Sequence, residues 1–165
     1  MQHQPRRLLL LACTSTKRAD LHPIPAIQRY DGPSFRMLRK WRAANAAAAV
    51  HLDILILSAR LGLIAADALI SDYNERMTRA RAAELREAVD TALTHTLAQR
   101  ELYAATLVHL GQDYLPAIGQ AMLATPACGF VSFTTGGIGV RLSQIKAWLT
   151  TDANGTTGCD GARCL

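Results

Sequence analysis

The sequence predicts an α/β protein, a three-layer sandwich built on a mostly parallel sheet of four or more strands. Four short apolar runs lie at residues 8–12, 52–57, 104–110 and 129–133. None of them alternates between polar and apolar residues, which is typical of strands that are covered on both faces. Patterns typical of amphipathic helices follow each run. Strands that alternate with helices form parallel sheets through right-handed crossovers, with helices packed on both faces.

Helices are expected over residues 34–50, 78–100, 112–123 and 138–149. Apolar residues recur three and four positions apart in these segments, as Leu142, Ile145 and Leu149 do in the last one. A longer passage, residues 59–77, shows no regular period. Long irregular segments in compact domains are often functional.

The length of 165 residues fits one domain. We expect a single α/β domain over residues 1–150 and a flexible tail over 151–165, which contains glycines and two of the four cysteines, Cys159 and Cys164. No apolar run approaches the ~20 residues needed to cross a bilayer. No small-residue cleavage site follows residues 8–12, so a cytoplasmic protein is expected. The Cys and His spacings indicate no metal site, no cofactor is expected, and nothing in the sequence indicates an oligomeric state.

Positive charge is concentrated in the N-terminal quarter. Nine Lys and Arg residues face two acids through Arg42, whereas the remaining nine face eleven acids. This asymmetry fits a polyanionic partner, nucleic acid, or a phosphorylated ligand. A solvated arginine-rich surface explains it equally well.

The polar segments that follow the four strands are expected to meet at one edge, because ligands of such sheets bind beyond the carboxyl ends of the strands. These segments begin at Cys13, Ser58, Gly111 and Thr134. Ser58, Gly62 and Tyr73 are candidate ligand-binding residues of the second segment. Asp67 or Asp113 is a candidate catalytic carboxylate that positions water, although an acid in the irregular passage, such as Asp67, is more often a cap or turn residue.

The first segment, "CTSTK", combines a thiol, three hydroxyls and a cation. Small donors after a strand can surround a phosphate or the polar edge of a base, so Thr14, Ser15 and Thr16 are candidate ligand contacts. Lys17 supplies charge and can lower the pKa of Cys13, which makes both candidate catalytic residues. The alternative is that Cys13 is a small buried residue closing the strand.

The last segment, "TTGGIGVR", is a glycine-rich turn that enters a helix. Gly136, Gly137 and Gly139 can expose backbone amides at the helix N-terminus, which favours an anion. Arg141 would lie in the first helical turn, within reach of a phosphate or carboxylate. The spacing matches neither a Walker A loop nor a full dinucleotide motif, and a turn required only for packing remains the alternative.

The expected helix at residues 34–50 places Arg36, Arg39 and Lys40 on one side. Three cations at this spacing can follow a phosphate backbone, which makes them a candidate nucleic-acid surface. A solvated basic face is the alternative.

Three segments, "ACTSTK", "YDGPSF" and "LSARLGLIAADALISDYNERM", together resemble the YaaA family of peroxide-stress proteins and its smaller relatives. The last of these carries the most specific pattern, with Ser58, Gly62, Asp67, Tyr73 and Met77 in the order typical of that family. The resemblance spans about residues 8 to 149. Leu61 stands where the family usually has an aromatic residue, and the chain is much shorter than YaaA itself.

The resemblance implies DNA binding and a role in limiting oxidative DNA damage. The "CTSTK" turn also resembles a cysteine-lysine motif in archaeosine synthase, which modifies a tRNA base. We therefore expect a protein that binds a nucleobase, a nucleotide or nucleic acid, and that as an enzyme acts on a base or its N-glycosidic bond. The alternatives are a non-catalytic DNA-binding module of an oxidative-stress response and a biosynthetic enzyme acting on a free nucleoside or nucleotide.

Overall fold

A computed structural model describes residues 5–99, 102–119 and 123–151, and the structural statements below concern these residues. The expected tail, including Cys159 and Cys164, lies outside the described residues. Five strands form the central sheet in the order β4-β3-β1-β6-β7. They are β1 (Arg7–Ala12), β3 (Leu52–Ser58), β4 (Gly62–Ala65), β6 (Ala105–His109) and β7 (Phe130–Phe133). All neighbours pair in parallel except β4, which runs antiparallel to β3.

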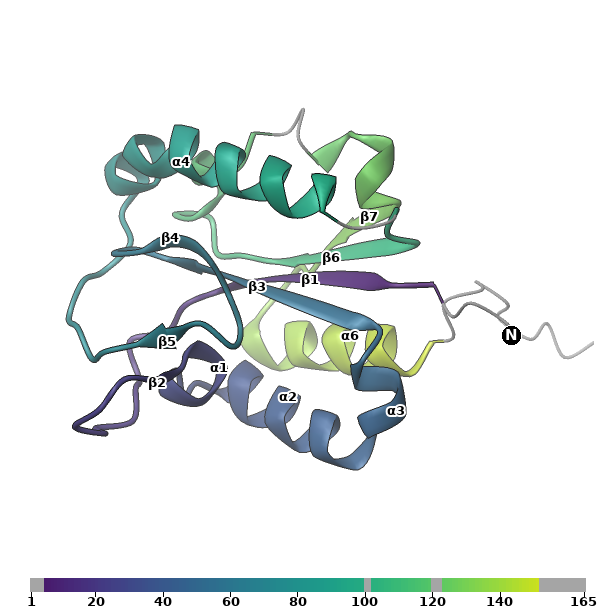
Figure 1. Ribbon diagram of the computed structural model, residues 1–165, viewed down its shortest axis with the longest axis horizontal. Helices are drawn as coiled ribbons and strands as arrows, with labels where there is room; N and C mark the ends of the chain where they lie inside the picture. Colours follow the sequence, from purple (N-terminus) through teal and green to yellow (C-terminus); the bar gives the residue numbers. More distant parts are fainter. Residues whose placement is uncertain (1–4, 100–101, 120–122, 152–165) are drawn as a thin grey trace, which may run out of the picture.

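Helices cover both faces of this sheet, so the predicted three-layer α/β fold is confirmed. Figure 1 shows α4 (Arg79–Ala98) above the sheet, and α1 (Ala26–Arg29), α2 (Pro33–Ala44), α3 (Ala46–Ala49) and α6 (Ile138–Thr150) below it. The central position of β1 follows from its sequence, since four consecutive leucines can be buried only where both faces are covered.

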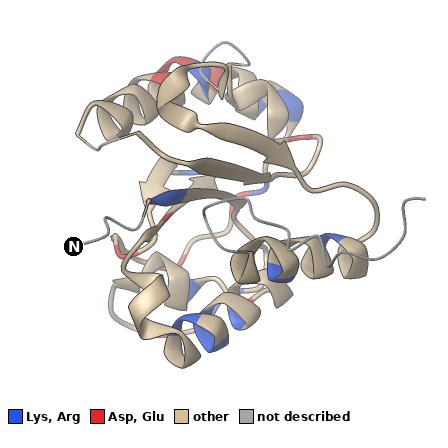
Figure 2. Ribbon diagram, turned by 90° about the vertical axis from the view of Figure 1, so that its right-hand side faces the viewer, with Lys and Arg blue, Asp and Glu red and all other residues tan. Residues whose placement is uncertain are grey.

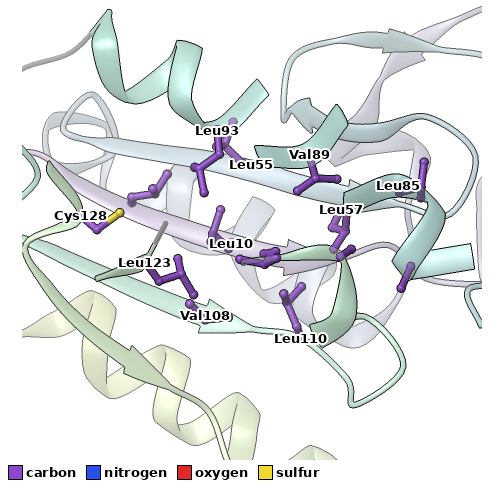
Figure 3. Close-up of a cluster of buried hydrophobic side chains, with 14 of the residues drawn as sticks. Leu10, Leu55, Leu57, Leu85, Val89, Leu93, Val108, Leu110, Leu123 and Cys128 are labelled. Carbon is purple, nitrogen blue, oxygen red and sulfur yellow. The ribbon is translucent and has the colours of Figure 1, made fainter. Parts of the chain in front are cut away.

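Alternate leucines of β1 belong to two separate hydrophobic clusters. Leu8 and Leu10 pack in the cluster between the sheet and α4, and Figure 3 shows side chains of this cluster. Leu9 and Leu11 pack in the cluster between the sheet and the helices α2 and α6. All four are at most 1% exposed. Each fully buried leucine contributes about 1.5 to 3 kcal/mol relative to an exposed one, so β1 anchors both cores.

The passage at residues 59–77 is more regular than the sequence indicates. It contains β4 and a short strand β5 (Leu69–Ile70), which pairs antiparallel with β2 (Ile24–Pro25). Gly62, at φ +72°, allows the tight return from β3 to β4. Strands of two to four residues are too short to show a recognisable period, which is why the sequence pattern did not indicate them.

Two expected helices differ from the structure. The segment predicted over 34–50 is divided, because Asn45 leaves the helical conformation (φ −131°, ψ 50°) between α2 and α3. The prediction of a helix over 112–123 is wrong for residues 112–119, which contain only the 3-10 turn η1 (Leu115–Ala117). Pro116 has no N–H and disfavours a preceding helical turn. A second 3-10 turn, η2 (Pro126–Cys128), precedes β7.

Candidate functional site at the carboxyl edge of the sheet

The segments that follow β1 and β6 meet at the carboxyl edge of the sheet. The Cys13 thiol lies 3.3 Å from the Tyr114 hydroxyl oxygen, and the Tyr114 hydroxyl lies 3.2 Å from the Cys13 carbonyl oxygen, which accepts its proton. Because β1 connects onward to β3 on one side and has β6 on its other side, the strand order reverses between β1 and β6. Ligands of open α/β sheets bind at such a reversal. We call this region the carboxyl-edge site.

Three buried hydroxyl groups form a chain at this edge. The Tyr30 and Tyr73 hydroxyl oxygens are 2.5 Å apart, and the Tyr73 hydroxyl lies 2.7 Å from Ser58 Oγ. Ser58 Oγ also accepts hydrogen bonds from the backbone N–H groups of Arg60 and Leu61, which fixes the turn after β3. Burial raises the pKa of both tyrosine hydroxyls above its usual range. Both tyrosines therefore stay protonated and act as neutral hydrogen-bonding groups.

Two cations approach the ring of Tyr73. Lys17 Nζ lies 4.4 Å from the Tyr73 ring centroid, and the Arg60 guanidinium carbon lies 5.9 Å from it. These are cation–π distances. Among the described residues neither cation has an acidic partner, whereas three nearby acids are each paired with another arginine: Asp31 with Arg39, Asp113 with Arg79, and Glu75 with Arg81. The exposed carboxylate of Asp72, next to Tyr73 in the chain, accepts from the Tyr73 backbone N–H and makes no ion pair with either cation.

His109, the last residue of β6, is held between two hydroxyl groups. Its Nε2 lies 3.1 Å from Ser34 Oγ at the start of α2, and its Nδ1 lies 2.8 Å from Thr134 Oγ1 after β7. Burial, assisted by the charge of Arg141, lowers the pKa of His109 to about 4. His109 is thus neutral near pH 7. It joins the ends of two strands to the layer of α2.

Of the three glycines in the turn after β7, only Gly136 has a backbone angle that other residues disfavour, and Gly137 (φ −72°, ψ 168°) has an ordinary extended conformation. Gly136 has φ +86°, and Gly137 is the N-cap of α6 without any side-chain capping bond. Gly139 lies inside the first turn of α6. Arg141 donates to the carbonyl oxygens of Gly136 (3.0 Å) and Leu110 (3.3 Å), so it ties the turn to β6 at this edge.

Most of the other predicted site residues follow a strand at the same edge. Thr14 Oγ1 donates to the Thr16 carbonyl oxygen at 2.8 Å, which curls the loop after β1, and Ser15 and Thr16 are exposed. Gly62 pairs with Ser58 at the start of β4. Asp113 follows β6, is half exposed, and lies 3.6 Å from Arg79.

Asp67 does not belong to the carboxyl-edge site. The antiparallel strand β4 carries the chain back along β3, so Asp67 lies with Leu52 and Asp53, at the amino end of β3, in a groove of about 300 Å³. The sequence places Asp67 close behind a strand but does not show that this strand runs in the opposite direction. The structure therefore leaves Asp113 as the predicted carboxylate at the edge.

The predicted basic face of α2 is smaller than expected. Arg36 and Lys40 are exposed, but Arg39 pairs with Asp31 and donates to the carbonyl oxygens of Ile27 (2.9 Å) and Tyr30 (2.8 Å). Arg39 therefore holds the turn between α1 and α2.

Six residues of the site were not selected from the sequence: Tyr30, Ser34, Arg60, His109, Tyr114 and Thr134. They come from segments far apart in the chain and meet only because the sheet is parallel. The only feature of the sequence that could have pointed to these residues was their position next to a strand end or a turn. It gave no indication of which side chains would touch.

The fold and the site define an α/β three-layer protein with a cationic, hydroxyl-rich site at the carboxyl edge of its sheet. Residues 8–149 match DUF6884, described as a family of unknown function, and the chain belongs to this family. No curated protein and no solved structure matches it. None of the described helices is long and apolar enough to span a membrane. Within the described residues, no three His, Cys, Asp or Glu side chains are grouped as metal ligands would be.

Proposed function

We propose that the protein is a cytoplasmic nucleotide-binding protein whose carboxyl-edge site takes a nucleotide or an exposed nucleotide of DNA or RNA. The observation that carries this proposal is the pair of cations, Lys17 and Arg60, that approach Tyr73 without an acidic partner among the described residues. A phosphate supplies the negative charge that this arrangement lacks.

The N-terminus of α6 supports the same ligand class. Gly137 caps this helix of 13 residues without a side-chain hydrogen bond, so within the described part of the chain the N-cap supplies no side-chain acceptor for the amide N–H groups of the first turn. Such groups, together with the helix dipole, attract anions. Tyr114 and Cys13 lie on the same edge, where an aromatic ring and a thiol suit the flat face and polar rim of a base.

The reaction class that we propose for this site is chemistry at a base or at its N-glycosidic bond. In this proposal Asp113 is the carboxylate that activates water, and its ion pair with Arg79 is solvent-exposed. Exposed pairs contribute about 0 to 1 kcal/mol, so Asp113 can exchange this partner for a substrate. The thiol of Cys13 is the other reactive group at the edge. A biosynthetic enzyme for a free nucleoside or nucleotide would use the same residues.

A non-catalytic DNA-binding module of a stress response is the second candidate. It is favoured by the exposed cations Arg36 and Lys40 on α2. Figure 2 shows Lys and Arg on the helix layer that contains α2 and α6, and these helices contain no Asp or Glu. The resemblance to the YaaA family supports this candidate and the first one alike.

A binding titration separates the two candidates. Nucleoside monophosphates, single strands and duplexes are titrated into the wild type and into Lys17→Ala, Arg60→Ala and Arg36→Ala/Lys40→Ala, at two salt concentrations. We expect Lys17→Ala and Arg60→Ala to weaken binding of mononucleotides, while Lys146→Ala, an exposed cation in the second half of α6, leaves it unchanged. If only duplexes bind, with a steep salt dependence and a loss confined to the α2 variant, the second candidate is correct and the first is not.

A further inference from the structure

The three hydroxyl groups of Tyr30, Tyr73 and Ser58 have one more O–H proton than the hydrogen bonds between them can take up. Three O–H groups share two oxygen–oxygen contacts, 2.5 Å and 2.7 Å long. Ser58 Oγ already accepts two backbone N–H groups. Since a hydroxyl oxygen has two acceptor lone pairs, Ser58 must donate its own proton to Tyr73. One tyrosine proton is therefore left without an acceptor among the described residues.

The exposed fractions of the two tyrosines indicate which O–H group is left without an acceptor. Tyr30 is 0% exposed, whereas Tyr73 is 9% exposed. A fully buried O–H group without an acceptor is costly, so Tyr30 donates to Tyr73. The Tyr73 oxygen then accepts from both Ser58 and Tyr30, which polarises its own O–H bond and strengthens it as a donor. Tyr73 is thus a nine-tenths buried donor that lacks an acceptor among the described residues, and the two cations lie 4.4 Å and 5.9 Å from its ring centroid.

We propose that Lys17, Arg60 and Tyr73 together bind the terminal phosphate of a phosphomonoester, as found in a mononucleotide or at a phosphorylated strand end. The inference rests on the proposed nucleotide site and deepens it. A monoester presents three terminal oxygens and a charge of about −1.5 to −2 at pH 7. An internal phosphodiester has two free oxygens and a single charge. Two cations and one hydroxyl donor therefore match the three oxygens and the charge of the monoester better than those of the diester, and the exposed carboxylate of Asp72, which accepts from the Tyr73 backbone N–H, adds repulsion to either ligand alike.

The test compares each nucleoside 5′-monophosphate with its methyl phosphodiester and with inorganic phosphate by calorimetric titration. We expect the wild type to prefer the monoester over the methyl diester by about tenfold to a hundredfold, the range for a hydrogen bond to a charged group. Tyr73→Phe should reduce this preference severalfold or more and change diester binding little. Tyr103→Phe is the matched control, since Tyr103 is also buried but donates its hydroxyl to Asp53 at the other end of the sheet.

A second variant keeps the inference testable if Tyr73→Phe does not fold. Arg60→Met removes an exposed guanidinium and should lower monoester affinity more than diester affinity. Equal wild-type affinities for monoester and diester, or an unchanged preference in Tyr73→Phe, would overturn the inference while leaving the nucleotide site standing. Inorganic phosphate that binds as tightly as every nucleotide would overturn the assignment to nucleotides. Absence of any nucleotide binding by the wild type would reject the proposed function itself.

Discussion

The ammonium group of Lys17 lies 4.4 Å from the ring centroid of Tyr73 and has no acidic partner among the described residues. An aromatic ring holds a cation in place with about 0.5 to 2 kcal/mol but does not neutralise it. The positive charge of Lys17 therefore remains available to a ligand. This pairing is the structural basis of the predictions about binding.

Replacing Lys17 should affect nucleotide binding more than the stability of the fold. Lys17→Met removes the charge and keeps an unbranched side chain over Tyr73, so the free energy of unfolding should fall by no more than the contribution of the cation–π contact, about 0.5 to 2 kcal/mol. Binding of a nucleoside monophosphate should weaken by about tenfold or more, because a charge-assisted contact is lost. Chemical denaturation and titration of the same samples measure the two effects. Loss of stability without loss of binding would show that Lys17 has only a structural role.

Gly32 is required by the close approach of the loop after β1. A Cβ atom at Gly32 would lie 2.6 Å from Cγ2 of Thr14. Overpacking of this kind costs about 1 to 3 kcal/mol, so Gly32→Ala should lower the melting temperature by several degrees. Adding Thr14→Ser removes the methyl group and retains the hydroxyl, and should recover part of the loss. No recovery in the double variant would mean that the loop after β1 does not pack as described.

His109 makes the stability of the fold depend on pH. Its pKa is about 4 in the folded protein and near 6.5 when unfolded, so the unfolded chain binds more protons between these values. The contribution of His109 to the free energy of unfolding is therefore fully present above pH 6.5. It is lost as the pH drops toward 4, which lowers the free energy of unfolding by up to about 3 kcal/mol. Urea unfolding from pH 4 to 7 measures this slope. His109→Gln should flatten it, and an unchanged slope in that variant would assign the pH dependence to other groups.

Arg7 fastens the C-terminal end of α6 to the sheet. Its guanidinium donates to the carbonyl oxygens of Trp148 (2.6 Å), Leu149 (3.2 Å) and Thr151 (2.9 Å), and lies 4.7 Å from a Trp148 ring centroid. Arg7→Met removes these bonds from a buried site and should destabilise the fold by about 2 to 4 kcal/mol. Denaturant unfolding, with the exposed Arg36→Met as control, measures it. A change no larger than that of the control would contradict this role.

The parts of the fold that follow from local pattern were predictable from the sequence. The leucines of residues 8–11 indicated a strand buried on both faces, and β1 is the central strand of the sheet. The apolar spacing around Leu85, Val89 and Leu93 indicated α4, whose buried face carries all three. The convergence of loops at the carboxyl ends followed from the parallel order. In the structure Lys17 and Ser58 both lie near Tyr73, a contact that the sequence did not indicate.

The parts that depend on long-range contacts were not predictable. Asp67 was misplaced because four residues of β4 carry no sign of their antiparallel direction. Arg39 was assigned to a binding surface because its charge is visible in the sequence, whereas its bonds to carbonyl oxygens in and after α1 are not. Tyr30 and His109 were missed because their partners come from distant segments. Local periodicity contains no information about such pairs.

The most direct test of the account is the melting temperature of the wild type and of Lys17→Met with and without nucleoside 5′-monophosphates. A ligand present at a hundredfold excess over its Kd stabilises the native state by about 2.7 kcal/mol, which corresponds to a rise of about 5 to 10 °C for a chain of this size. We predict such a rise for the wild type with at least one nucleotide and its loss in Lys17→Met. The same rise in both proteins, or no rise with any nucleotide, would contradict a nucleotide site at the carboxyl edge of the sheet.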